Sequence, residues 1–102
     1  MAVIEINQNN FQQEVMESEK PVLLDFWAPW CGPCRMLGPT VDQIAEEEDW
    51  VKVCKVNVDE QPELAKQFQV MSIPALFVMK QGKIVAQSLG VRPKEDILEM
   101  LA

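Results

Sequence analysis

Ten consecutive residues decide the fold of this chain: Asp25-Phe26-Trp27-Ala28-Pro29-Trp30-Cys31-Gly32-Pro33-Cys34. They join the apolar run Pro21–Trp27 to the start of a helical pattern. The run is apolar on both parities, as expected for a buried central strand. Two thiols three residues apart on a helical turn face the same side and come within bridging distance. The stretch therefore predicts a reversible disulfide where a central strand passes into a helix.

The segments on either side alternate between strand and helix patterns. The expected elements are a strand over 3–6, a helix capped by Asn10, a long helix after Cys31, a strand over 51–58, a helix beginning at Pro62, a hairpin of 75–79 and 84–86 across Gln81-Gly82, and a last helix opened by Pro93. This order predicts an α/β fold with a mixed sheet and helices on both faces. The thiols then lie at the C-terminal end of a central strand, where open α/β sheets carry their sites.

Length and composition narrow the class of protein. The chain has 102 residues, which is the size of one domain, and we expect a single domain over 1–102. Its 48% hydrophobic and 25% charged residues are typical of a folded chain. Its apolar runs are too short to span a membrane. The net charge of −7 disfavours nucleic acid and anionic lipid as partners.

Cysteine and histidine usage narrows the chemistry. Three cysteines are an odd number, which argues against a framework of structural disulfides and favours a reducing compartment. The first residues, Met1-Ala2-Val3-Ile4-Glu5, lack the features of a secretory signal, so we expect a cytoplasmic protein. The absence of histidine excludes imidazole as a base or a metal ligand.

The two thiols of the motif are expected to play different parts. Cys31 at the helix start meets unpaired N–H groups and the helix dipole, which lower a thiol pKa, so it is the expected attacker. Cys34, one turn into the helix and better shielded, is expected to resolve the mixed disulfide. Gly32 allows another backbone to approach closely, and Pro33 stiffens the first turn.

Two other interpretations of the pair remain open, half of a zinc site and a static disulfide. A Cys-x-x-Cys zinc site normally has a second such pair, and this chain offers only Cys54. Cys54 lies among valines and is most simply a small buried hydrophobe, with a regulatory thiol as the alternative. Redox chemistry is the favoured interpretation, without a metal.

An acid inside the apolar run is the third chemical feature. Asp25 stands between Leu24 and Phe26, so burial should raise its pKa and make it a proton acceptor near neutral pH. The alternative is a carboxylate satisfied by backbone donors or by Lys55. Met36, Met71, Met79 and Met100 show no cofactor-like arrangement and suggest core or groove filling.

The ten-residue motif, together with Pro39, Ile73-Pro74 and Gly90, resembles the thioredoxin family along essentially the whole chain. The resemblance implies the thioredoxin fold, a central mixed sheet of about five strands flanked by four helices. It also implies an electron carrier that reduces protein disulfides. Gly-Pro between the cysteines is the spacer of the reducing members of that superfamily, so we expect an electron donor.

The same resemblance assigns roles to single residues. Asp25 would take the proton of Cys34 through water, and Lys55 would tune its titration; an exposed edge lysine is the alternative for Lys55. Trp27 is expected to form a packing wall beneath the site. Gly38-Pro39 is expected to kink the long helix.

A client-binding groove is also implied. On residue statistics alone the Ile73-Pro74 bond would be trans, but the resemblance implies a cis proline that faces the sulfurs. The backbone of Ile73 would pair with an extended client segment. The groove would comprise Trp30, Gly32, Pro33, Ile73, Pro74, Gly90 and Val91.

The resemblance implies no bound cofactor. Electrons would come from a thioredoxin reductase that depends on NADPH or ferredoxin, and the partners would be that reductase and disulfide-containing proteins. The expected state is a monomer. The chain departs from the commonest family pattern at Ala75 and Cys54. A binding module with idle thiols and a metal-handling protein are the other classes of function considered.

Overall fold

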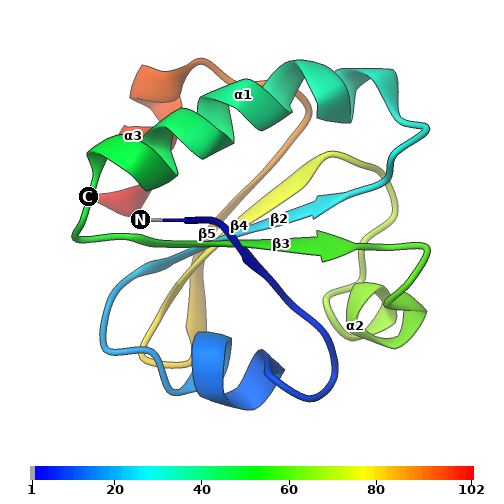
Figure 1. Ribbon diagram of the computed structural model, residues 1–102, viewed down its shortest axis with the longest axis horizontal. Coiled ribbons are helices and arrows are strands. Elements are labelled where there is room, and N and C mark those ends of the chain that lie inside the picture. Colours follow the sequence, from blue (N-terminus) through cyan, green and yellow to red (C-terminus); the bar gives the residue numbers. More distant parts are fainter. Residues whose placement is uncertain (1) are drawn as a thin grey trace.

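A five-stranded mixed sheet forms the centre of the computed structural model, which describes residues 2–102 (Figure 1). Met1, where the expected domain 1–102 begins, lies outside the described residues. The strands are β1 (Ile4–Glu5), β2 (Val22–Trp27), β3 (Lys52–Asn57), β4 (Ala75–Lys80) and β5 (Lys83–Leu89). Their order in the sheet is β1-β3-β2-β4-β5. The apolar run of the motif is therefore the central strand, as its pattern predicts.

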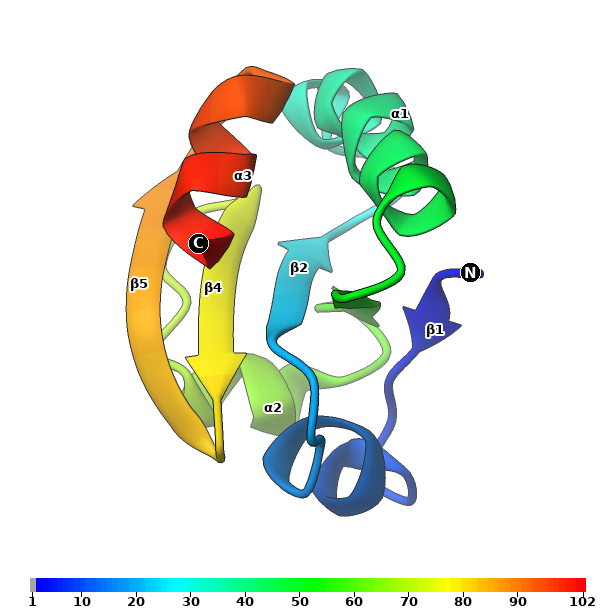
Figure 2. The same ribbon diagram turned by 90° about the vertical axis from the view of Figure 1, so that its left-hand side faces the viewer.

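Helices cover both faces of this sheet. α1 (Gly32–Glu47) and α3 (Lys94–Leu101) lie on one face, and η1 (Gln12–Met16) and α2 (Pro62–Gln67) lie on the other (Figures 1 and 2). Over residues 2–102 this is a mixed sheet of five strands with four helices, which confirms the expected α/β fold. Pro39 lies inside α1, and the helix continues through it to Glu47.

Strand directions follow the expected connections. β3 runs parallel to β1 and β2, whereas β4 is antiparallel to both β2 and β5. The register pairs Asp25 of β2 with Lys55 of β3. Gln81 and Gly82 join β4 to β5 with φ angles of 53° and 76°. Both turn residues are thus left-handed, the conformation that matches the twist of a tight hairpin.

The core consists of two apolar clusters, one on each face of the sheet. The cluster under η1 and α2 contains four phenylalanine rings with neighbouring centroids 5.2–5.8 Å apart. The cluster under α1 and α3 consists mainly of leucine, isoleucine and valine. Alternation along β2 explains the division: Leu24 and Phe26 point to the first cluster, and Leu23 points to the second.

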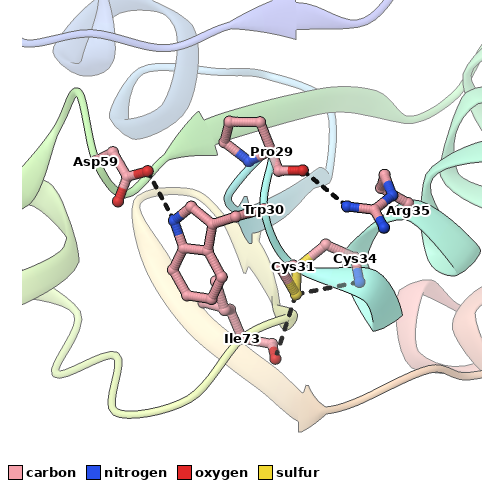
Figure 3. Close-up of a disulfide and its surroundings, with 7 residues drawn as sticks. All are labelled: Pro29, Trp30, Cys31, Cys34, Arg35, Asp59 and Ile73. Atoms are coloured by element: carbon pink, nitrogen blue, oxygen red, sulfur yellow. Dashed lines mark hydrogen bonds between the residues drawn. A yellow bond between two sulfur atoms is a disulfide. The ribbon is translucent and has the colours of Figure 1, made fainter.

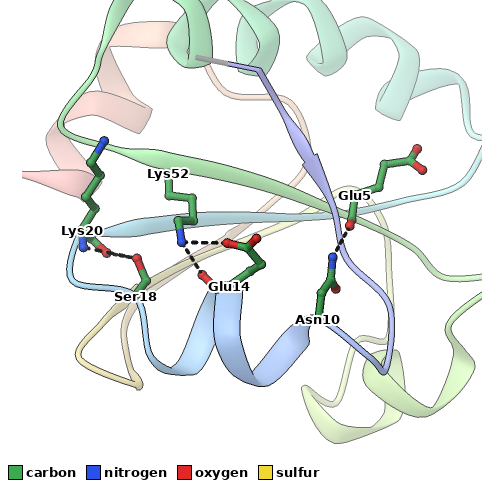
Figure 4. A network of polar contacts seen from close by, with 6 residues as sticks. All are labelled: Glu5, Asn10, Glu14, Ser18, Lys20 and Lys52. Atoms are coloured by element: carbon green, nitrogen blue, oxygen red, sulfur yellow. Dashed lines mark hydrogen bonds and ion pairs between the residues drawn. The ribbon is translucent and has the colours of Figure 1, made fainter.

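The first helix differs from its prediction in its start and its type. Asn10 does not cap it, because its Oδ1 accepts from the N–H of Asn7 (2.8 Å) and its Nδ2 donates to the carbonyl of Glu5 (2.9 Å; Figure 4). The helix is a single π-type turn in which the N–H of Glu17 donates to the carbonyl of Gln12 (2.9 Å). The side chain that looked like a cap instead ties the turn to the end of β1.

Candidate active site

A disulfide joins Cys31 and Cys34, with their Cα atoms 5.2 Å apart (Figure 3). Cys31 is the N-cap of α1 and has an extended backbone, and Cys34 lies in the first helical turn. The N–H of Cys34 donates to the sulfur of Cys31 (3.2 Å). An N–H of the first helical turn, where the helix itself offers no acceptor, therefore points at the sulfur that is expected to carry negative charge when the pair is reduced.

Exposure does not distinguish the two cysteines. Each residue is only 5% exposed, so the expectation that Cys34 is the better shielded of the two is wrong for the disulfide form. Bridging brings both sulfurs into one small cluster with Ala28, against which Trp27 and Ile73 pack. The difference between the thiols therefore lies in their hydrogen bonds.

Local contacts hold the loop between β2 and α1. The N–H of Cys31 donates to the carbonyl of Ala28 (3.2 Å), and the guanidinium of Arg35 donates to the carbonyl of Pro29 (3.0 Å). The indole N–H of Trp30 donates to Asp59 Oδ2 (2.9 Å), which ties the loop to the end of β3 (Figure 3). No feature of the sequence singled out Asp59 as this partner.

A second segment meets the disulfide from across the site. The Ile73-Pro74 peptide bond is cis, as the resemblance implied. The sulfur of Cys31 lies 3.8 Å from the carbonyl oxygen of Ile73, a contact that a reduced thiol can turn into an S–H···O hydrogen bond (Figure 3). The N–H of Gly90 donates to the carbonyl of Pro74 (2.9 Å). The motif, the cis proline and the end of β5 thus meet at one end of the strands β2, β4 and β5.

The residues around the disulfide present apolar surface. Trp30 is 67% exposed, Val91 is 46% exposed, and Pro33 is also exposed. Gly32 is half-buried, and a Cβ added to it would meet no heavy atom within 4 Å. Ile73 and Gly90 are half-buried, whereas Pro74 is buried. All seven expected groove residues therefore lie on the segments that meet here, and Pro74 lies beneath the surface.

Of the methionines expected to fill the core or the groove, two are exposed and so lie outside the core. Met71, two residues before Ile73, is 94% exposed, and Met36 in the first part of α1 is 70% exposed. Met79 is buried as expected. Met71 is therefore not a core residue, and its position just before Ser72-Ile73-Pro74 leaves groove filling as its prediction.

A buried carboxyl lies in β2, the strand that leads into the redox motif. Asp25 is only 2% exposed, and its Oδ1 is fully buried without a hydrogen-bond partner. Burial raises the pKa of Asp25 from 3.8 to about 7; the charge of Lys55 lowers this pKa and that of Asp42 raises it. Such a carboxyl can accept or release a proton near neutral pH.

Lys55 lies beside this carboxyl and not at an edge of the sheet. Its strand, β3, is flanked by β1 and β2, and its side chain is 19% exposed. Its ammonium pairs with Asp42 Oδ1 of α1 at 3.0 Å. The alternative of an exposed edge lysine is therefore wrong for its position.

Cys54 lies apart from this site. It is fully buried in the phenylalanine-rich cluster and is a free cysteine. Burial raises the pKa of its thiol to about 12, with a smaller lowering by Lys52 and a smaller raising by Glu14. Its thiol is therefore protonated at neutral pH and behaves as a small apolar group.

Two features of residues 2–102 concern metal binding and membrane spanning. Within that range no three His, Cys, Asp or Glu side chains gather where they could hold a metal ion. None of the helices in the same range is long and apolar enough to cross a membrane.

Comparison with known proteins settles the family. The family model described as Thioredoxin matches residues 2–102. The chain belongs to the thioredoxin family. It is 48% identical to "Thioredoxin 1" of Nostoc sp. (strain PCC 7120) over 98% of this chain and 94% of that protein. It is 50% identical to "Thioredoxin 1" of Synechococcus elongatus over 94% and 91%, and 49% identical to "Thioredoxin" of Alicyclobacillus acidocaldarius over 99% and 96%.

Membership of the thioredoxin family gives the disulfide its chemical meaning. A thioredoxin with a Cys-x-x-Cys pair at bridging distance is a dithiol–disulfide oxidoreductase, and its disulfide is the redox centre. The family also implies, in general terms, a reductase that reloads the pair and clients that carry disulfides.

Proposed function

We propose that this thioredoxin is a general protein-disulfide reductase, which passes two electrons from the Cys31/Cys34 dithiol to disulfides of client proteins. The observation that carries the proposal is the place of the Cys31 sulfur. It lies 3.8 Å from the carbonyl of Ile73, at an end of the sheet bordered by exposed apolar residues. A client chain can bring its disulfide to this end of the sheet while its backbone pairs with Ile73.

Reduction proceeds in two exchanges. The Cys31 thiolate attacks one client sulfur, so that a Cys31–client disulfide forms, the client S–S bond breaks, and one client thiolate leaves. Cys34 then loses its proton, attacks the Cys31 sulfur, and releases the second client thiolate as the Cys31–Cys34 bond forms. The client gains two electrons and, with two protons, becomes a dithiol; the protein ends as the disulfide described above.

Asp25 is the proposed acceptor of the Cys34 proton, through water. Its pKa of about 7 leaves a substantial ionised fraction at neutral pH while keeping it basic enough to take a proton from a thiol. No histidine is present in the chain to do this instead. Lys55 is the proposed modulator of that carboxyl, and Trp27 and Pro39 are proposed to act only through packing and helix shape.

Client binding is proposed to rest on backbone pairing and apolar contact. The peptide group of Ile73 supplies the backbone partner, and the surrounding side chains supply contact area without sequence-specific polar groups. Such a groove accepts many client sequences. Its residues are Trp30, Gly32, Pro33, Ile73, Pro74, Gly90 and Val91.

The supply of electrons and the setting are further parts of the proposal. We infer that a thioredoxin reductase, dependent on NADPH or on ferredoxin, reduces the Cys31–Cys34 disulfide after each turnover. The protein itself then needs no bound cofactor. It works as a monomer in the cytoplasm and contributes to cell redox homeostasis.

A coupled assay tests the proposal. The protein is mixed with NADPH, an NADPH-dependent thioredoxin reductase and insulin, and NADPH oxidation is followed; a ferredoxin-linked reductase replaces it in a parallel assay. We expect turnover by the unaltered chain and none by Cys31→Ser. An unaltered chain that accepts electrons from either reductase and leaves insulin oxidised would overturn client reduction.

A trapping experiment tests which thiol attacks. Cys34→Ser should accumulate a covalent client adduct through Cys31, because the resolving thiol is missing. Cys54→Ser, which leaves the motif intact, is the matched control and should accumulate no adduct. Adducts that formed on Cys31→Ser instead would reverse the assignment of attacker and resolver.

A further inference from the structure

Asp42 of α1 is a charged residue that the exchange steps do not use. Its side chain is 54% exposed. Its Oδ1 is 3.0 Å from the ammonium of Lys55. This ion pair connects the surface of α1 to the strand that borders the buried acid.

The position of the Lys55 ammonium under α1 is also shown by its closeness to Gly38. A Cβ built on Gly38 would lie 3.8 Å from the Lys55 ammonium. Gly38 and Asp42 are four residues apart and therefore lie on the same face of α1. The ammonium thus rests against the helix, between a residue without a side chain and a carboxylate.

Asp25 is the other acid within the influence of Lys55. The register places Asp25 and Lys55 side by side on β2 and β3, and both point to the α1 side of the sheet. The ammonium nevertheless forms its ion pair with Asp42, while Asp25 Oδ1 has no hydrogen-bond partner. One lysine is therefore shared unequally between an exposed carboxylate and a buried one.

We propose that Asp42 is a positioning residue that draws the Lys55 ammonium toward α1 and so keeps the Asp25 carboxyl free to accept the Cys34 proton. The role of Asp25 in this statement rests on the function proposed above. A carboxylate in a close ion pair with an ammonium is a weak proton acceptor, because the proton would have to displace the cation. Loss of Asp42 would release Lys55 to pair with Asp25.

The other groups around Asp25 leave Lys55 and Asp42 as the charges that act on it. Its neighbour in β4 is Leu76, which carries no charge, and α3 contributes the apolar Ile97 and Leu101 to this face. Cys31 and Cys34, at the start of α1, become titratable when they are reduced. Titration in the disulfide form therefore isolates the effect of the Lys55–Asp42 pair.

The test is an NMR titration of the Asp25 side-chain carboxyl in the oxidised protein. In Asp42→Asn the midpoint should fall by about half a pH unit, which raises the ionised fraction at pH 5.5 about threefold. Glu46→Gln, an exposed site one turn further along α1, removes the same charge and should shift the midpoint much less. Asp42→Glu should restore most of the original midpoint.

A double substitution distinguishes the positioning of Lys55 by Asp42 from direct charge repulsion between Asp42 and Asp25. In Lys55→Gln no ammonium can be released, so adding Asp42→Asn should move the Asp25 midpoint by less than half of its shift in the unaltered chain. Equal shifts in Asp42→Asn and Glu46→Gln, an unmoved or raised midpoint in Asp42→Asn, or an undiminished shift in the Lys55→Gln background would each overturn the proposal.

A rate measurement then tests whether the Lys55–Asp42 ion pair affects thiol–disulfide exchange. The pH dependence of mixed-disulfide resolution by Cys34 should move with the Asp25 midpoint in Asp42→Asn. If the midpoint moves and the rate profile does not, Asp42 does not control the proton acceptor, and the proposed role of Asp25 itself fails. If only the proposed role of Asp42 is wrong, the unaltered protein still reduces its clients and its rate still depends on the ionisation of Asp25.

Discussion

Neighbouring residues of β2 and β3 point to opposite faces of one sheet, and the two faces differ in their chemistry. Leu24 and its partner Cys54 enter the phenylalanine-rich cluster under η1 and α2. Asp25 and its partner Lys55 lie on the face covered by α1, the helix that begins at the redox motif. On the first face, the raised pKa of Cys54 keeps its thiol protonated. On the second face, the pKa of the Asp25 carboxyl is near neutral. Burial therefore has opposite consequences for the two groups: it moves the pKa of the Asp25 carboxyl toward neutral pH and the pKa of the Cys54 thiol away from it.

The largest expected difference between the two faces is thiol reactivity. In the reduced, folded protein at pH 7, iodoacetamide should label Cys31 first, because a helical N–H points at its sulfur. Cys54 should react at least about a thousandfold more slowly, since a pKa of about 12 leaves only about one thiolate in 10⁵. Mass spectrometry of labelled peptides over time provides the measurement. Rapid labelling of Cys54 without unfolding would remove the contrast between the faces.

Stability against pH is the next expected difference. The pKa of Asp25 is 3.8 in an unfolded chain and about 7 in the folded one. Between these values the unfolded chain loses the proton that the folded chain retains, so the free energy of unfolding falls as pH rises, by about 4 kcal/mol in all. This contribution is level below pH 3.8 and above pH 7.

Asp25→Asn should remove that fall. Urea unfolding of the variant and of the unaltered chain at pH 4, 6 and 8 should show a stability difference that grows in favour of the variant. Glu46→Gln, which removes one exposed carboxylate, serves as the control and should not change the slope between pH 4 and pH 8. Parallel curves for Asp25→Asn and the unaltered chain would mean that Asp25 is not buried as a proton-retaining acid.

A smaller effect is expected from polarity on the apolar face. Cys54→Ser and Cys54→Ala place side chains of similar size in the same site, but serine buries a hydroxyl among apolar neighbours. We expect the serine variant to be less stable than the alanine variant by about 1–2 kcal/mol in urea unfolding. Both should retain insulin reduction, since Cys54 lies outside the redox site. A loss of turnover in both would instead indicate a role for this thiol.

The smallest expected effect concerns client affinity at the loop between β2 and α1, where the two faces meet the groove. Trp30 is 67% exposed, and its indole N–H bonds to Asp59. Trp30→Ala should raise the KM for a protein client about three- to tenfold with less than about 1 kcal/mol change in stability. Trp30→Phe, which retains a ring without the hydrogen bond, should fall between. Steady-state kinetics with insulin measures both, and an unchanged KM in Trp30→Ala would remove this residue from the groove.

Sequence patterns predicted the elements well where local chemistry is strong. The apolar run before the motif, the positive-φ turn at Gln81-Gly82 and the proline at the start of α2 each reflect a constraint within a few residues. Asn10 misled for the same reason, because its side chain can bond to any nearby backbone group. The structure shows that it bonds to the end of β1 and not to the helix.

The amino-acid sequence by itself determined the redox pair, the acid in the central strand and the family, because these depend on residue type and spacing along the chain. Tertiary structure alone decided that Trp30 bonds to Asp59 and that Lys55 pairs with Asp42, and it supplied the contact between Ile73 and Cys31 that only the family resemblance had implied. Each of these contacts joins residues between 13 and 42 positions apart. Such contacts arise only when strands and helices pack, because the direction of a side chain depends on register and on which face of the sheet it reaches.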